Sequence, residues 1–327
     1  MTCKAFREKY EAEKLRSLSP RTIETADTAF NHLESLINPA RLASLTEATI
    51  SIFQAKPREW KIQETSIASY PRHIKAALNW AVSMGLMPVM PKIHMPKGSK
   101  GQRMMRGRPI TTAELEKMLQ QVPTVRPKDA AAWEHYLKGL WYSGLRLGES
   151  LVVSWDEDAP ISIDLSGRRP RLRILAEAEK GNRDRLLPMT PDFAEFLLAT
   201  PESDRHGRVF KLGGQFTNAP MTSRRVGRVI SEIGKKAGVV VNSGAGKYAS
   251  AYDLRRAFGT RWARKVMPTV LQNLMRHDSI ETTLRYYVDV DADGMAEELW
   301  KAMQGNINTS INTPSLERKK EEKESGE

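Results

Sequence analysis

Four stretches of the chain carry side chains that suit chemistry on a phosphodiester. They are YSGLRLGESL (142–151), EAEKGNRDRLLPM (177–189), AYDLRRAFGTRWA (251–263) and MRHDSIETTLRYYV (275–288). Each stretch offers a cation, a hydrogen-bond donor or a nucleophile. The groups are Arg146, Lys180, Arg255, His277 and one of the adjacent tyrosines Tyr286 and Tyr287.

These residue types can together break and remake a phosphodiester without a metal ion or another cofactor. Two arginines can hold the non-bridging oxygens of phosphorus bidentately, which a lysine does less well. Donors aimed at developing charge contribute ~2.7–4 kcal/mol each, and His277 can join them. Lys180 can protonate the leaving oxygen, a step that typically gives ~10²–10⁴-fold in rate. A tyrosine phenol can attack phosphorus and form a covalent intermediate.

The helical period distinguishes the two tyrosines. Ser279 or Asp278 can cap a helix with Glu281 as its capping-box partner. At ~100° per residue one apolar stripe forms, and it contains Ile280, Thr283, Leu284 and Tyr287. Tyr286 falls off this stripe. The spacing therefore predicts that Tyr287 packs in the core and that Tyr286 is available as the nucleophile.

In this order and spacing, the four stretches resemble the tyrosine recombinases, also called the phage-integrase family. SGLRLGE resembles the helix start that carries the family's first arginine, here Arg146. Lys180 resembles the family's β-hairpin lysine, with Arg185 and LLP following it. YDLRRAFGTR places Arg255 at the second arginine, and LMRHDSIETTLRYY places His277 and Tyr286 at the family's spacing.

The resemblance implies a fold, an activity and partners. It implies a two-domain, C-shaped clamp on double-stranded DNA and a 3′-phosphotyrosine intermediate formed without ATP. It further implies a homo-tetramer on paired DNA sites, with accessory DNA-bending proteins as candidate partners. Two alternatives stay open, namely a DNA-binding protein that has lost catalysis and a type IB topoisomerase-like enzyme.

One position departs from the family's pattern. The family usually has histidine three residues before the second arginine, and this chain has Tyr252 there. A phenol can still donate and accept a hydrogen bond, but it is a poor base at neutral pH. We interpret Tyr252 as part of a retuned site. Arg256, next to Arg255, is expected to contact the DNA backbone or the solvent.

Composition supports a nucleic-acid partner. The 327 residues include 51 Lys+Arg and 39 Asp+Glu, a formal net charge of +12. Such an excess of cationic side chains favours a polyanionic partner, although a basic protein that is merely soluble is the simpler alternative. The single cysteine, Cys3, forms no intramolecular disulfide or zinc cluster, which fits a reducing cytoplasm. No apolar run approaches the ~20 residues that a membrane span needs.

The pattern along the chain predicts a mainly α fold with a small antiparallel β-sheet. Residues 1–90 are expected to form helices, with amphipathic patterns at 25–37 and 65–84, and the resemblance implies that they are a core-binding domain. A catalytic domain is expected at 111–303 and a disordered tail at 304–327. Residues 161–189 alternate as two or three short strands, whereas 201–223 and 242–249 are expected to be loops.

Basic residues outside the four stretches are candidates for DNA contacts. The linker 91–110 contains several cations and no acid, so it is either a solvated tether or a strap along the phosphate backbone. Arg224 and Arg225 begin a basic helix for which a solvated face is nearly as plausible. The DNA-binding candidates are Lys92, Lys97, Lys100, Arg103, Arg106, Arg185, Arg224 and Arg225.

Overall fold

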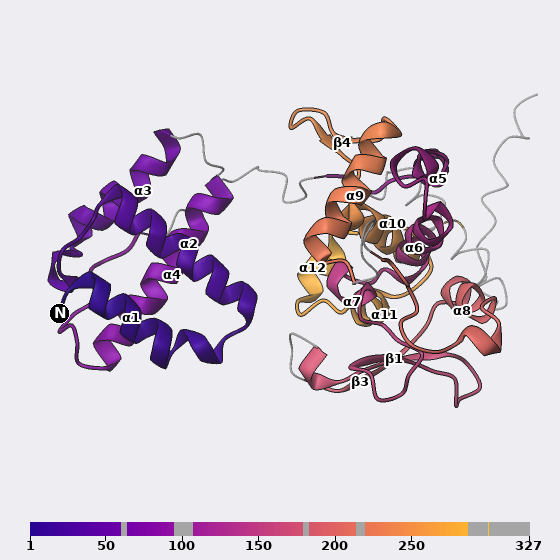
Figure 1. Ribbon diagram of the computed structural model, residues 1–327, viewed down its shortest axis with the longest axis horizontal. Helices are drawn as coiled ribbons and strands as arrows, with labels where there is room; N and C mark the ends of the chain where they lie inside the picture. The colour runs from indigo at the N-terminus through magenta and orange to yellow at the C-terminus, as the bar shows by residue number, and fades with distance from the viewer. Residues whose placement is uncertain (60–63, 95–106, 179–182, 214–219, 287–299, 301–327) are drawn as a thin grey trace, which may run out of the picture. The chain divides into compact units, whose positions relative to one another are not determined.

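The computed structural model describes residues 1–59, 64–94, 107–178, 183–213, 220–286 and 300. The chain divides into two compact units, Met1–Arg103 and Met104–Glu327 (Figure 1). Most of the described residues are helical and the strands are short, which confirms the predicted mainly α class with small antiparallel sheets. Within the described part, no helix is long and apolar enough to cross a membrane.

The first unit is a set of helices around one apolar core. Its helices are α1 (Cys3–Glu13), α2 (Pro20–Leu36), α3 (Glu47–Glu59) and α4 (Glu64–Ser83). The side chain of Ser19 accepts a hydrogen bond from the backbone N–H of Thr22, so α2 begins at the Ser-Pro signal. Phe30 and Leu33 of α2 are buried together with Ile74 and Leu78 of α4. Both predicted amphipathic helices are therefore present.

The second unit holds the remaining helices around a second core. They are α5 (Thr112–Val125), α6 (Ala130–Ser143), α7 (Leu147–Ser150), α8 (Pro191–Leu198), α9 (Ser223–Lys236), α10 (Ala251–Ala263), α11 (Pro268–Met275) and α12 (Ile280–Leu284). The helix α5 begins with a capping box between Thr111 and Glu114. The helix α10 packs against α6, α9 and α11, and its residues 253–259 are all buried. The side chains of α10 are thus fixed in position by three neighbouring helices.

A three-stranded antiparallel sheet lies at one edge of the second unit (Figure 1). Its strands are β1 (Ile161–Asp164), β2 (Arg171–Ile174) and β3 (Arg185–Pro188), in that order. Leu172 pairs with Ile163 on one side and with Leu187 on the other. All three are buried, so the predicted alternation has produced the apolar face that packs on the helices.

A second, two-stranded hairpin lies where the sequence suggested only a loop. Its strands are β4 (Val240–Asn242) and β5 (Lys247–Tyr248). Both are too short to show an alternating pattern. Gly246 has φ +57°, a conformation that suits glycine in the connecting turn. The expected loop at 242–249 is therefore correct for the turn at 243–246 and wrong for Asn242, Lys247 and Tyr248, which are strand residues.

Candidate active site

The turn after α6 positions Arg146. Gly144 ends α6 in the left-handed conformation with φ +57°, and a Cβ there would collide with the ring of Phe258. Glycine is thus required both by the backbone and by the close approach of α10. Arg146 follows as the N-cap of α7 and donates through Nη1 to Glu149 Oε1 at 2.7 Å. Its side chain is 40% exposed, so the guanidinium is accessible.

Arg255 lies behind this turn, buried in α10. It is 4% exposed and donates to the carbonyl oxygens of Gly144 and Met275. Desolvation, followed by the charge of Arg276, lowers the pKa of Arg255 to about 9. That value is above neutral pH, so the guanidinium remains charged. The side chain of Arg255 therefore links the turn between α6 and α7, which contains Gly144, to the end of α11, which contains Met275.

His277 follows α11 and is held by a hydrogen bond. Its Nδ1 lies 2.9 Å from Oγ1 of Thr283, a fully buried residue of α12. Desolvation lowers the pKa of His277 to about 4, and the charges of Arg255 and Arg146 add to this effect. At neutral pH the imidazole is therefore uncharged, with one N–H donor and one acceptor nitrogen.

Tyr286 lies between His277 and α10. Its ring stacks on that of His277 with a centroid separation of 5.9 Å and an interplanar angle of 15°. On the other side it packs against Gly259, where an added Cβ would lie 2.5 Å from Tyr286 Cε1. Desolvation raises the pKa of Tyr286, while the charge of Arg255 opposes that rise. The phenol is thus protonated at neutral pH beside a neutral imidazole and a guanidinium.

The predicted apolar stripe of α12 is only partly correct. Thr283 is buried, but Leu284 is 41% exposed, and Tyr286 packs against the small core formed by Phe258, Leu271 and Met275 together with Ala263. The helix has five residues and is held by the His277–Thr283 bond and the Tyr286 ring, so its own apolar stripe does not decide its orientation. Tyr287 lies outside the described residues.

Tyr252 and Arg256 form a neighbouring pair on α10. Tyr252 is 56% exposed, and the guanidinium carbon of Arg256 lies 4.5 Å from its ring centroid. Arg256 is 5% exposed and forms an ion pair with Asp253, which is fully buried. The expectation that Arg256 faces the solvent was therefore wrong, because Asp253 provides a buried anion one helical turn away. A contact between Arg256 and the DNA backbone stays a prediction.

The structure describes only some of the other residues that the sequence predicts to contact DNA. Lys92, Arg224 and Arg225 are exposed, and Arg185 is half-buried at the start of β3. Lys180 lies in the connection between β2 and β3, outside the described residues. The linker residues Lys97, Lys100, Arg103 and Arg106 also lie outside them.

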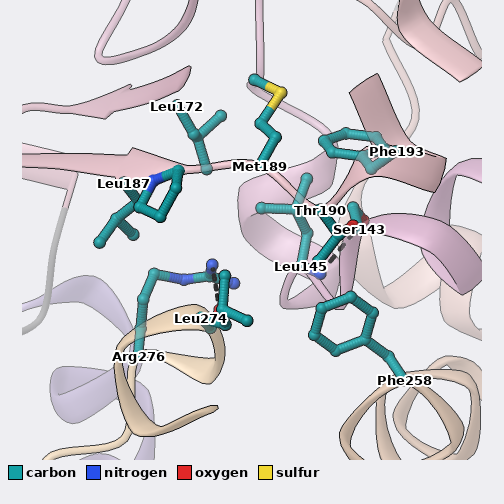
Figure 2. Close-up of a pocket in the computed structure, with 11 residues that line it drawn as sticks. Ser143, Leu145, Leu172, Leu187, Met189, Thr190, Phe193, Phe258, Leu274 and Arg276 are labelled. Carbon is teal, nitrogen blue, oxygen red and sulfur yellow. Dashed lines mark hydrogen bonds between the residues drawn. The ribbon is translucent and has the colours of Figure 1, made fainter. Parts of the chain in front are cut away.

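Sequence reasoning missed Arg276. This residue is 4% exposed and forms an ion pair with Glu149, with 2.8 Å between Nη2 and Oε2. Figure 2 shows its side chain in a narrow pocket with Leu172 and Leu187 of the sheet on one side and Leu274 and Phe258 on the other. The available signal was local, namely an arginine directly before His277 in the stretch LMRHDSI.

The site offers cations and hydrogen-bond donors rather than metal ligands. Among the described residues, no group of three or more His, Cys, Asp or Glu side chains could hold a metal ion. Arg146 and Arg255 lie close enough to His277 for their charges to lower its pKa, and the phenol ring of Tyr286 stacks on the same imidazole.

Comparison with known proteins identifies the family. The model of the phage integrase family matches residues 108–293, more than half of the chain, and that of the phage integrase SAM-like domain matches residues 2–95. A tyrosine recombinase XerC from Chlamydia caviae is 28% identical over 186 residues, which are 54% of this chain and 53% of that protein. The chain thus spans about half the length of this curated relative.

Solved structures share the fold. The Tn1549 transposon integrase in complex with transposon right end DNA has a TM-score of 0.65 at 17% identity, covering 93% of this chain and 100% of that one. A lambda integrase dimer bound to a COC′ core site has a TM-score of 0.67 at 16% identity, covering 88% and 95%. A lambda integrase tetramer bound to a Holliday junction has a TM-score of 0.66 at 15% identity, covering 88% and 77%. With both family models matched in order along the sequence, the chain belongs to the phage integrase family.

Proposed function

We propose that this protein is a site-specific DNA recombinase that cuts and rejoins duplex DNA through a phosphotyrosine at Tyr286. The observation that supports this most is the meeting of three of the four stretches, 142–151, 251–263 and 275–288, at one point. Arg255 joins the Arg146 turn to the end of α11 by donating to Gly144 and Met275. His277 follows directly, and its ring stacks on Tyr286.

In the proposed reaction, the phenolic oxygen of Tyr286 attacks the scissile phosphorus and the 5′-oxygen leaves. Arg146, Arg255 and His277 donate hydrogen bonds to the non-bridging oxygens as negative charge develops. Lys180 protonates the leaving 5′-oxygen. The phenolic proton passes to solvent water, for which the exposed hydroxyl of Tyr252 is the candidate relay. The 5′-hydroxyl of a partner strand then attacks the phosphotyrosine and restores the phenol, so the bond energy is conserved.

DNA binding is proposed to use both units. The formal charge of +12 favours a polyanion, and the exposed Arg224 and Arg225 begin α9 with a Thr222 cap. The basic linker and Arg185 would add phosphate contacts. The DNA complexes of the similar integrases support a homo-tetramer working on two paired sites. Accessory DNA-bending proteins are further candidate partners in this proposal.

A covalent-capture experiment tests this function. Nicked, labelled fragments from the DNA that flanks the gene are incubated with the protein and denatured in SDS. We expect labelled protein with the wild type and with Tyr287→Phe, and none with Tyr286→Phe. The Phe ring preserves packing over Gly259, so the loss would report on the hydroxyl alone.

Other outcomes identify the alternatives. DNA binding without an adduct on any fragment would favour the non-catalytic binder and make Tyr252 the suspected cause. An adduct that forms with little site preference, together with relaxation of supercoiled plasmid by the monomer, would favour the topoisomerase-like enzyme. An adduct lost only in Tyr287→Phe would move the nucleophile to the neighbouring residue.

A further inference from the structure

Arg276 occupies a position that disfavours an arginine in two ways. It ends α11 with φ 52° and ψ 50°, and among the described residues only Asn38 is another non-glycine residue at positive φ. Such a backbone conformation costs energy for any residue with a Cβ. The side chain is also 3% exposed, and burying a cation is costly unless it is paired. A favourable interaction must offset both the cost of the backbone conformation and the cost of burying the guanidinium.

The interaction is with the groups that hold Arg146 and Arg255. The backbone oxygen of Arg276 accepts from Nη2 of Arg146 at 2.6 Å. Its side chain donates to Glu149 Oε2 at 2.8 Å and to the carbonyl of Leu274 at 2.9 Å. The carbonyl of Gly144, which accepts from Arg255, lies 3.4 Å from Nη2 of Arg276.

Glu149 is shared by two guanidinium groups with different surroundings. Its Oε1 accepts from Arg146 Nη1 at 2.7 Å, and its Oε2 accepts from Arg276 and from the backbone N–H of Arg146. Burial alone would raise the pKa of Glu149, but Arg276 and Arg146 outweigh it and lower the pKa to about 2. The side chain of Arg146 is 40% exposed, whereas that of Arg276 is 3% exposed.

Of these two guanidinium groups, only that of Arg146 can therefore turn to a phosphate arriving from solvent. If Arg146 were the sole partner of Glu149, that movement would leave a carboxylate that is only 13% exposed without a cation. Removing one partner of a buried ion pair is strongly unfavourable. With Arg276 in the apolar pocket of Figure 2, Glu149 keeps a cation whatever Arg146 does.

We propose that Arg276 is a positioning residue that keeps Glu149 paired, so that Arg146 can exchange this carboxylate for the scissile phosphate. The inference rests on the proposed function and assigns different roles to the two arginines that contact Glu149. Glu149 and Arg276 form the permanent pair, and Arg146 is the exchangeable member. Arg276 does not touch the DNA in this scheme.

The test compares rates of phosphotyrosyl adduct formation on a nicked substrate for the wild type, R276G, E149Q and R276G/E149Q. Glycine suits the left-handed turn, so R276G removes the side chain without straining the backbone. We expect R276G to slow adduct formation at least tenfold, because Glu149 then retains Arg146. The double variant should recover most of that loss, since a neutral glutamine in place of Glu149 would hold Arg146 only weakly.

Thermal melting and DNA affinity are measured beside the rates. If R276G does not fold, R276M/E149Q replaces the pair by neutral side chains of similar length, and it should form the adduct within a few-fold of wild type. Additive losses in the double variants, or an R276G rate equal to wild type, would overturn the inference while leaving the proposed function intact. A wild-type protein that forms no adduct would instead overturn the proposed function, and this inference with it.

Discussion

The ring of Tyr286 occupies the space that a side chain at Gly259 would need. A Cβ built on Gly259 would lie 2.5 Å from Cε1 and 2.8 Å from Cδ1 of Tyr286. The absence of a side chain at this position of α10 therefore allows the phenol to stack beside His277.

Replacing Gly259 by alanine should displace Tyr286 without unfolding α10. The methyl group would favour the helix by about 1 kcal/mol but would collide with the ring. We expect Gly259→Ala to keep or raise the melting temperature while slowing adduct formation at least tenfold. Gly148→Ala is the stability control, because nothing lies within 4 Å of its added Cβ. Full activity in Gly259→Ala would show that the ring can occupy another position.

Removing the hydroxyl of Thr283 should loosen His277. Thr283→Val keeps the shape of the side chain but loses the bond to Nδ1 of His277, which is 2.9 Å long. A buried group left unpaired costs about 1–3 kcal/mol, so we expect reduced stability and an adduct rate lowered about tenfold. Thr282→Val, on the neighbouring half-buried residue, serves as the matched control. Equal effects of the two substitutions would contradict a role for the hydroxyl.

Acidification should destabilise the protein through His277. Desolvation and the nearby arginines lower the folded-state pKa from 6.5 to about 4. The unfolded state therefore binds more protons within this window, and the stability contributed by neutral His277 is lost as the pH falls from about 6.5 to about 4. Urea unfolding of the wild type and His277→Gln at a pH of about 7.5, above this window, and at pH values of about 5.5 and 4.5, within it, tests the prediction. The variant should lose less stability than the wild type on acidification, and parallel curves would refute the assignment.

Neutralising Asp253 should unfold the start of α10. Asp253 is fully buried and accepts from Lys247 Nζ at 3.2 Å and from the Ser250 backbone N–H at 3.0 Å, besides its ion pair with Arg256. Asp253→Asn leaves Arg256 buried without an anion, for which a loss of about 3–5 kcal/mol in unfolding free energy is expected.

The control for Asp253 is an exposed carboxylate in a longer ion pair. Glu202 is 91% exposed and lies 3.7 Å from Arg205, so Glu202→Gln should change the unfolding free energy by less than about 1 kcal/mol. Denaturant titration of both variants provides the comparison. A similar small effect at Asp253 would mean that Arg256 finds another partner or reaches solvent.

The order and spacing of local motifs were enough to predict the family, the mainly α class and a small antiparallel sheet of two or three strands. Each of these depends on residues close together in sequence, such as the SGLRLGE turn or the alternation in 161–189. Helix starts also depend on residues close together in sequence. The helix α2 begins at the Ser19-Pro20 signal, and α5 begins at the Thr111–Glu114 capping box. The roles of Arg146, Lys180, Arg255, His277 and Tyr286 remain predictions for the capture experiment.

Only the tertiary structure decided which cationic side chains are buried and which anionic side chains pair with them. Periodicity shows which residues share a helical face, but it does not show which other element meets that face. Arg256 was expected outside and lies inside, because Asp253 is buried with it. Arg276 was overlooked, because its partner Glu149 is 127 residues away in the chain. The sequence by itself thus determined which reactive groups the chain offers, whereas the pairing of charges between distant segments, which fixes their positions and pKa values, required the fold.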